Sequence, residues 1–148
     1  MAVAFDHRGV KLRDAVIGEI VALSHEVHDL GTDDASVRID YPDKAQEIGD
    51  AIRSGDAERG VLVCGSGVGA SVAACKLAGI RAAICHDTYS AHQGVEHDDM
   101  NILTLGARVI GSEPGLECAL AFLGATFSGE PRHRRRLDKV LAIESSGA

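Results

Sequence analysis

The sequence predicts an α/β protein in which helices cover both faces of a parallel, doubly wound sheet. Two observations lead to this fold class. Short apolar runs of four to six residues alternate with longer segments whose apolar residues recur at helical spacing. Most of these runs lack interleaved polar residues, which is typical of parallel strands buried on both faces. We therefore expect a three-layer α/β/α, Rossmann-like domain with five parallel strands, whose order the sequence does not specify.

The first strand and helix lie at the N-terminus. Residues 2–5 form an apolar run that ends at Asp6, and residues 10–23 repeat apolar side chains at helical spacing. A second strand is expected at 26–31, followed by a polar loop. Residues 43–55 then form a helix that ends at a glycine.

A glycine-rich segment separates the third strand from the third helix. The apolar run 60–64 ends in Cys64, and the following helix, 67–79, begins among glycines and ends at one. Two further strands are separated by a helix, and two helices complete the chain. Their expected bounds are 80–85 and 101–106 for the strands, 88–99 for the helix between them, and 113–127 and about 131–145 for the last two helices.

Composition limits the class of function. The 148 residues and 45% hydrophobic content suit one domain, 1–148, with its own core. A net charge of −7 and an aromatic content of 3% argue against a nucleic-acid partner. No apolar run reaches the ~18 residues of a membrane helix and no secretory signal is visible, so we expect a cytoplasmic protein without a membrane partner. The four cysteines form no CxxC pair and are expected as free thiols.

Reactive side chains follow several of the predicted strands. In a doubly wound parallel sheet, ligands bind outside the carboxyl ends of the strands, so we expect the functional site at that edge. The residues found there are Asp6 and His7, Asp29, Cys64 with its glycines, Cys85 to Asp87, and Gly106 with Arg108.

The stretch VLVCGSGVGAS, residues 61–71, admits three interpretations. As G-x-G-x-x-A between strand and helix, with Asp87 after the next strand, it fits a dinucleotide-binding turn. As an anion or oxyanion site, its glycine N–H groups and the helix N-terminus stabilise negative charge, and Cys64 becomes a candidate reactive group. In the third, Cys64 is only the last buried residue of a strand. The extra Gly69 and the lack of room for a second domain weigh against the first interpretation.

Arginines and histidines supply further candidates. Arg132 and Arg136 are four residues apart on a predicted helix, so they share a face that suits a phosphate monoester. The alternative is a solvated basic face paired with nearby carboxylates. His92 and His97 are five apart, which misses the spacing of a helical metal pair, and no metal site is expected. His7 and His97 are better interpreted as hydrogen-bonding or proton-transfer groups.

Five motifs in register carry a resemblance to a known family. They are FDHRG (5–9), DYP (40–42), CGSGVGASVAACKLAGIRAA (64–83), EHDDMNILTLGARVIG (96–111) and RHRRRLDKVLAIE (132–144). This set resembles the ribose-5-phosphate isomerase type B family, whose superfamily also holds galactose-6-phosphate isomerase subunits. The resemblance covers nearly the whole chain.

The resemblance implies a reaction and an assembly. The reaction is the aldose–ketose interconversion of ribose 5-phosphate and ribulose 5-phosphate in the pentose phosphate pathway, through a cis-enediolate and without a metal or nucleotide cofactor. The assembly is a homodimer or a tetramer with sites between subunits. Cys64 is implied as the general base and His97 as the group that opens the sugar ring. The N–H groups of residues 65–69 are implied as the cradle for the enediolate oxygen, with Ser66 as a hydroxyl that assists there. The sugar and its phosphate are expected to contact Asp6, His7, Tyr41, Gly65, Gly67, Gly69, Asp98, Arg108, Arg132 and Arg136.

Three positions bear on the base and the substrate. Ala70 stands where one catalytic variant of the family has a glutamate base, which leaves Cys64 as the candidate base in the loop. Asp98 and Cys75 stand where the family usually has asparagine, and an ionised aspartate cannot donate a hydrogen bond to a sugar oxygen. An allose, galactose or tetrose phosphate is therefore an alternative substrate. A non-catalytic module that binds a sugar phosphate or a nucleotide is the alternative from another class.

Overall fold

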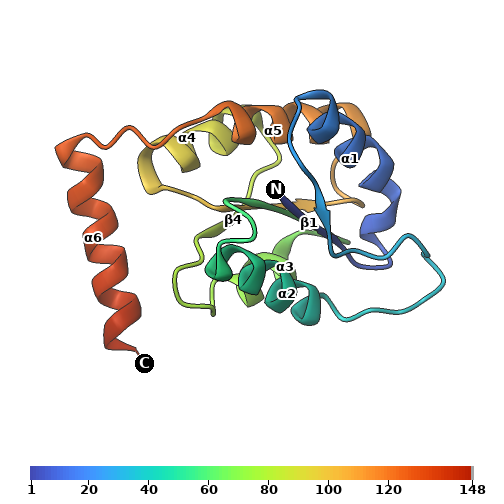
Figure 1. Cartoon of the computed structure of the whole chain (residues 1–148), viewed down its shortest axis with the longest axis horizontal. Coiled ribbons are helices and arrows are strands. Elements are labelled where there is room, and N and C mark those ends of the chain that lie inside the picture. Colours follow the sequence, from blue (N-terminus) through green and yellow to red (C-terminus); the bar gives the residue numbers. More distant parts are fainter. Residues whose placement is uncertain (148) are drawn as a thin grey trace.

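A five-stranded parallel sheet forms the centre of the computed structural model, which describes residues 1–147. The strand order is β2-β1-β3-β5-β4, with β3 in the middle (Figure 1). Every strand pair is parallel, which confirms the predicted Rossmann-like fold class. The strands are β1 (Ala2–Phe5), β2 (His28–Asp29), β3 (Gly60–Cys64), β4 (Ala82–Ile84) and β5 (Ile102–Gly106).

Helices cover both faces of the sheet. Figure 1 shows α1, α4 and α5 on one face and α2 and α3 on the other. The buried apolar side chains accordingly form two clusters, one under each set of helices. The helices are α1 (Arg13–Ala22), preceded by the 3-10 helix η1 (Gly9–Leu12), α2 (Tyr41–Ser54), α3 (Val68–Ala74), α4 (Thr88–Asp98), α5 (Ser112–Gly124) and α6 (Pro131–Ser146).

The central strand β3 contributes to both cores. Successive side chains of a strand point to opposite faces of the sheet. Val61 and Val63 therefore pack with α1, α4 and α5, whereas Leu62 and Cys64 pack on the side of α2 and α3. Burial on both faces explains why this segment of the sequence is apolar throughout. It also directs the Cys64 thiol toward α3, beneath the glycine loop.

The register of the sheet brings three strand ends together. β3 pairs with β5 so that Cys64 lies opposite Gly106, and it pairs with β1 so that Val63 lies opposite Phe5. The loops that follow β1, β3 and β5 therefore meet at one edge. This is the carboxyl edge, where the sequence predicts the functional site.

Several element bounds differ from the sequence-based expectation. The helix expected at 10–23 starts as the tighter η1, and the second strand is reduced to two exposed residues. The helix expected at 67–79 ends at Ala74. Tyr41 and Pro42, expected in a loop, form the first turn of α2, where proline is favoured because its missing N–H has no helical partner anyway.

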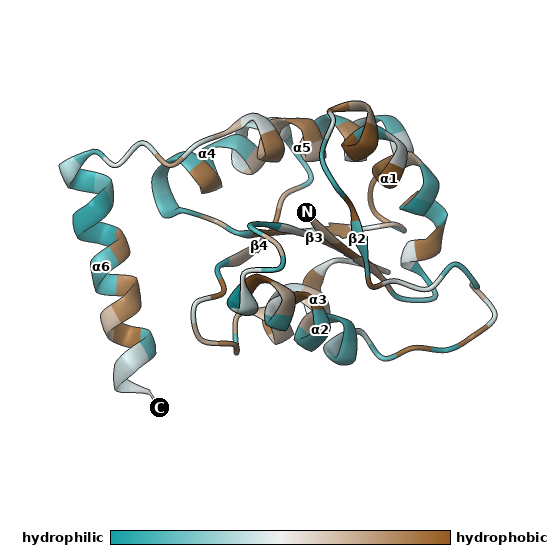
Figure 2. Ribbon diagram, in the orientation of Figure 1, coloured by the Kyte–Doolittle hydropathy of each residue, from teal (hydrophilic) through white to brown (hydrophobic). Residues whose placement is uncertain are grey.

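The last helix, α6, stands apart from the rest of the chain (Figure 1). It packs near its beginning against α4, where His133 and Leu137 are its buried residues. Val140, Leu141 and Ile143 are 50%, 39% and 72% exposed. Figure 2 shows that the hydrophobic residues of α6 gather in its C-terminal half, away from α4. These apolar side chains are left largely uncovered by residues 1–147.

Alanine substitutions at two glycines test how tightly β3 packs against the turn that follows β1. A Cβ at Gly9 would lie 2.2 Å from the Val63 carbonyl oxygen, whereas a Cβ at Gly18 on α1 would meet nothing within 4 Å. We expect Gly9→Ala to lower the free energy of unfolding by about 1–3 kcal/mol through overpacking. Gly18→Ala should raise it by about 0.5–1 kcal/mol because alanine loses less entropy in a helix. Urea denaturation at equal protein concentration measures both, and a stable Gly9→Ala variant would contradict this packing.

Candidate active site

The Cys64 thiol lies at the end of β3 under the glycine loop. The residue is 4% exposed, and its Sγ accepts a hydrogen bond from the Gly67 N–H at 3.1 Å. Gly67 has φ +82°, a left-handed conformation that residues with a side chain rarely adopt, and it is the residue before α3. The loop thus turns back over the thiol and directs the Gly67 N–H toward it. Ser66 lies at the top of this turn, and its side chain is exposed to solvent.

Neighbouring elements leave no space for a side chain at particular glycines in and beside this loop. A Cβ at Gly69 would lie 2.6 Å from Cζ of Tyr41, so the tyrosine ring covers the loop from the start of α2. A Cβ at Gly106, at the end of β5, would lie 2.5 Å from the backbone of Ser66. The glycines of the loop and of β5 therefore serve close backbone approach as well as turn geometry.

Asp6, at the end of β1, shapes the adjoining turn. Its carboxylate is 4% exposed, and its Oδ1 accepts the N–H groups of Arg8 at 2.8 Å and Gly9 at 2.7 Å. These bonds explain why the chain enters a 3-10 turn here and why His7 and Arg8 face outward. His7 Nδ1 lies 3.2 Å from the Ile39 carbonyl oxygen, which ties this turn to the loop before α2.

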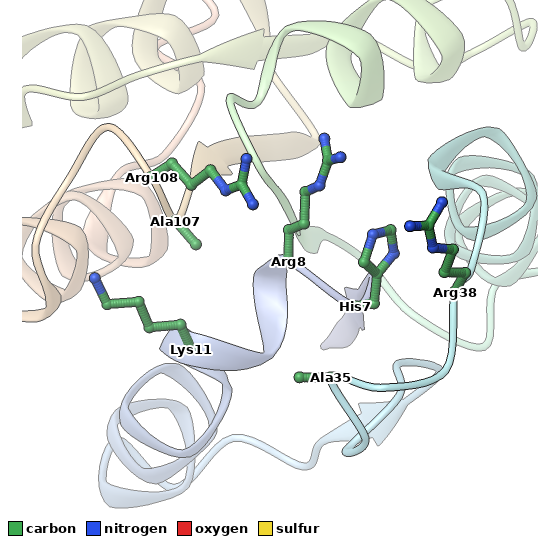
Figure 3. A pocket seen from close by; sticks show the side chains of 7 residues that line it. All are labelled: His7, Arg8, Lys11, Ala35, Arg38, Ala107 and Arg108. Carbon is green, nitrogen blue, oxygen red and sulfur yellow. The ribbon is translucent and has the colours of Figure 1, made fainter.

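A basic cavity of about 560 Å³ opens beside this turn. Figure 3 shows the side chain of Arg8 between those of Arg108 and His7, with Arg38 reaching toward His7 from another loop. Arg8 also adjoins the glycine loop, since a Cβ at Gly65 would lie 3.0 Å from its Cδ. Two members, His7 and Arg108, come from the predicted phosphate-binding set. The lining residues are His7, Arg8, Lys11, Ala35, Arg38, Ala107 and Arg108.

His97 and Asp98 lie at the other edge of the sheet from Cys64 in the same chain. They end α4, just before β5 begins at Ile102. Cys64 lies opposite Gly106, at the far end of β5. Four residue steps of about 3.3 Å separate the two ends of that strand, which is roughly 13 Å. One chain therefore does not bring these predicted site residues together.

His97 instead stacks on a buried histidine of α6. The His97 and His133 ring centroids are 3.9 Å apart at an interplanar angle of 30°. His133 is 1% exposed and its Nδ1 lies 2.6 Å from Ser128 Oγ, while His97 Nδ1 lies 2.9 Å from Gln93 Nε2. Burial, followed by the neighbouring His97, lowers the pKa of His133 below its ordinary value. The buried His133 ring is thus the platform against which His97 stacks.

Arg132 and Arg136 lie on the first turns of α6 and line no part of the basic cavity. Both are exposed, and Arg132 Nε pairs with Glu130 Oε2 at 2.8 Å. This surface ion pair is the alternative to phosphate binding that the sequence suggested for Arg132. Arg136 has no carboxylate within 4 Å among residues 1–147.

The dinucleotide interpretation of the glycine loop lacks its acidic partner. β5 lies between β3 and β4, so Asp87, which follows β4, does not flank the turn after β3. Its carboxylate accepts the Ser90 N–H at 2.7 Å and caps α4. Asp87 therefore caps a helix, and it is not placed to bind the ribose of a dinucleotide.

Comparison with known proteins identifies the family. Residues 1–140 match the family described as Ribose/Galactose Isomerase. The chain belongs to the ribose/galactose isomerase family. Ribose-5-phosphate isomerase B of Escherichia coli (strain K12) is 41% identical over 144 residues, covering 97% of this chain and 95% of that protein. D-erythrulose-4-phosphate isomerase of Pectobacterium atrosepticum is 37% identical over 129 residues, covering 87% and 85%.

A solved structure of the ribose/galactose isomerase family has the same fold. Ribose-5-phosphate isomerase B of Clostridium thermocellum superposes with a TM-score of 0.94 at 38% identity, covering 99% of this chain and 98% of that one. The predicted family and the enzyme class, a sugar-phosphate isomerase, are confirmed. The relatives named here differ in the sugar that their names carry.

Sequence reasoning missed several residues around the site of this isomerase. Arg8, Lys11 and Arg38 line the basic cavity, yet no motif in the sequence marks them as ligand-binding residues. Arg8 carried the one usable signal, because it directly follows His7 at the end of a predicted strand. The platform under His97 was missed because His133 lies within a run that is otherwise arginine.

Two features that would indicate other functions are not found in residues 1–147. No group of three or more histidine, cysteine, aspartate or glutamate side chains is arranged to hold a metal ion. Likewise, no helix in this range is both long and apolar enough to span a membrane.

The buried His133 generates a prediction on pH and stability. Because its folded-state pKa is lowered, the unfolded chain binds more protons below the ordinary histidine value of about 6.5. The free energy of unfolding should therefore fall as the pH drops below about 6.5. The asparagine of His133→Asn still offers Ser128 a hydrogen-bonding partner but does not titrate, so this variant should lose less stability at low pH. Thermal unfolding of both proteins between pH 7.5 and 5.5 tests this prediction. The same dependence of the melting temperature on pH in both proteins would contradict it.

Proposed function

We propose that the chain interconverts ribose 5-phosphate and ribulose 5-phosphate through a cis-enediolate, with Cys64 as the general base. The observation that supports this most directly is the thiol held at the end of β3 beneath the N–H groups of the glycine loop. N–H groups arranged in this way stabilise an oxyanion that forms during reaction. The relative at 41% identity named ribose-5-phosphate isomerase B supports the choice of sugar.

The proposed chemistry moves protons and needs no redox partner. The Cys64 thiolate takes the proton from C2 of the open-chain aldose, and the electron pair forms the C1–C2 double bond while O1 becomes the enediolate oxygen. N–H groups of the glycine loop, residues 65–69, other than the Gly67 N–H that bonds Cys64, hold that oxygen. A proton then passes from O2 to O1 through the Ser66 hydroxyl. Finally the thiol returns its proton to C1, which leaves the ketose carbonyl at C2.

Other candidates for the base are less well suited. Ala70 is fully buried and its methyl group accepts no proton. Asp6 is near the loop, but its Oδ1 already accepts two backbone N–H groups, so it organises the turn. Both observations support Cys64 as the base.

The site is proposed to lie between two copies of the chain. His97 is needed to open the sugar ring, and in its own chain it lies at the opposite sheet edge from Cys64. A second copy would supply it, together with Asp98. The uncovered apolar residues of α6 support such a dimer, as does the cavity of about 700 Å³ that α6 forms with the segment around β4. We therefore propose a homodimer, alone or within a tetramer.

The phosphate is proposed to bind in the basic cavity. His7 and Arg108 of one chain line it, and Arg132 and Arg136 would reach it from the α6 helix of the second copy. Guanidinium groups suit this role because they donate paired hydrogen bonds to phosphate oxygens. We place the reaction in the cytoplasm, in the pentose phosphate pathway, and without a metal or nucleotide cofactor.

A different sugar phosphate is the second candidate substrate. Asp98 is exposed beside His97, and an ionised carboxylate at that position accepts hydrogen bonds from sugar hydroxyls without donating any. The relative named D-erythrulose-4-phosphate isomerase makes a tetrose phosphate a specific alternative. Turnover assays over tetrose, pentose and hexose phosphates decide between them.

The role of Cys64 is tested by removing its thiol. Cys64→Ala should lower kcat for ribose 5-phosphate by a factor of at least ~100, within the range of general acid–base catalysis, while still binding a phosphorylated inhibitor. Cys118→Ala, which removes a buried thiol on α5, is the matched control and should retain turnover. Near-normal turnover by Cys64→Ala would make the residue a strand terminator and refute the proposed base.

The shared site is tested by mixing two inactive chains. Cys64→Ala chains retain His97, and His97→Ala chains retain Cys64, so a mixed dimer contains one intact site. After subunit exchange, the mixture should regain roughly a quarter of the wild-type activity. Size-exclusion chromatography accompanies the assay. A fully active monomer of 15.5 kDa, or mixed dimers without activity, would contradict a site built from two chains.

A further inference from the structure

The basic cavity holds more positive charge than one phosphate group requires. Arg8, Lys11, Arg38 and Arg108 are permanently charged at neutral pH, and His7 adds a further donor. Among residues 1–147, no acidic side chain lines the cavity. A phosphate monoester carries at most two negative charges. At least two of these cations therefore have no counter-charge when a single phosphate is bound.

These cations are also unpaired within the chain. Across residues 1–147, no carboxylate lies within 4 Å of Arg8, Lys11, Arg38 or Arg108. Seven other basic side chains have such partners: Arg13, Lys44, Arg53, Arg81, His92, His97 and Arg132. Like charges gathered in one cavity repel each other, and they remain together at a cost to stability. An arrangement of this kind is typical of a binding site for an anion.

The cavity is also larger than a single phosphate. Its volume of about 560 Å³ corresponds to roughly 20 water molecules at about 30 Å³ each, whereas one phosphate group is the size of a few waters. The cations come from separate segments: Arg8 and Lys11 from the turn after β1, Arg38 from the loop before α2, and Arg108 from the loop after β5 (Figure 3). Charge is thus spread around the cavity instead of focused on one point.

We propose that Arg8, Lys11 and Arg38 form a second anion subsite beside the phosphate-binding residues His7 and Arg108. The ligand class is a sugar that carries two phosphate groups. Among residues 1–147, no phenylalanine, tyrosine or tryptophan lines the cavity, which favours a sugar bisphosphate over a nucleoside diphosphate. This identification of a sugar rests on the proposed function, whereas the preference for two anionic groups rests on the cavity alone.

Arg8 connects the two subsites with the reactive loop. Its side chain runs along Gly65, next to Cys64, while it also lines the cavity. A bisphosphate bound across the cavity would therefore lie against the glycine loop and compete with a monophosphate substrate. Because Arg8 is close to the proposed chemistry, Lys11 and Arg38 are the better positions for a test.

Calorimetric titration at fixed ionic strength, in a buffer free of phosphate and sulfate, tests the proposal. The probes are inorganic phosphate, pyrophosphate, ribose 5-phosphate, ribose 1,5-bisphosphate and ADP. The wild-type chain should bind pyrophosphate at least tenfold more tightly than phosphate, and ribose 1,5-bisphosphate at least tenfold more tightly than ribose 5-phosphate. ADP should bind more weakly than the sugar bisphosphate.

Variants locate the second subsite. Lys11→Ala and Arg38→Ala should each lose about tenfold in affinity for pyrophosphate and at most about threefold for phosphate. Arg53→Ala removes an exposed cation on α2 outside the cavity and should change neither. Equal affinity of the wild type for phosphate and pyrophosphate would overturn the second subsite. So would variants that lose affinity for phosphate and for pyrophosphate by the same factor. Tighter binding of ADP than of the bisphosphate would overturn the sugar assignment.

The same samples separate this inference from the proposed function. If no sugar phosphate is turned over but the preference for two phosphates holds, the proposed isomerisation fails and the anion subsite stands. If turnover holds and the preference is absent, the subsite fails and the isomerase stands.

Discussion

The hydrogen bond from the Gly67 N–H to Cys64 Sγ is the interaction on which the site depends. It requires the left-handed backbone at Gly67, which turns the loop back over the end of β3. That path in turn brings Ser66 against Gly106 of β5 and Gly69 against the ring of Tyr41, where no side chain fits. The glycines after Cys64 therefore follow from one steric requirement. The loop must bring the Gly67 N–H to a buried thiol while its backbone passes close to two neighbouring elements.

Much of the fold was predictable because its cause is local. Alternating apolar runs and helical segments predict a parallel sheet covered on both faces, and the sheet has this form, with Val61 and Leu62 entering opposite cores. The strand order was not predictable, because each strand is similarly apolar and pairing depends on contacts between distant segments. The position of α6 was also inaccessible, since its charged first turns and apolar last turns are compatible with packing on any surface.

The candidate site was predictable to a different degree in each part. The glycine loop stands in continuous sequence and carries its own turn signal. The basic cavity does not, because Arg8, Arg38 and Arg108 come from three loops that only the tertiary fold brings together. The position of His97 also depends on the tertiary fold. His97 precedes β5 in the sequence, whereas Cys64 lies opposite the last residue of β5. This separation within one chain is why the proposed chemistry includes a second chain.

A crystal structure with bound ribulose 5-phosphate tests the central claim most directly, because it reports which group contacts the reacting carbons. We expect Cys64 Sγ in van der Waals contact with C1 and C2 on one face of the open-chain sugar. We also expect the loop N–H groups to donate to the sugar oxygens and His97 to come from a second copy of the chain. A sugar whose C1 and C2 face a carboxylate such as Asp6, with Cys64 shielded beneath the loop, would contradict it.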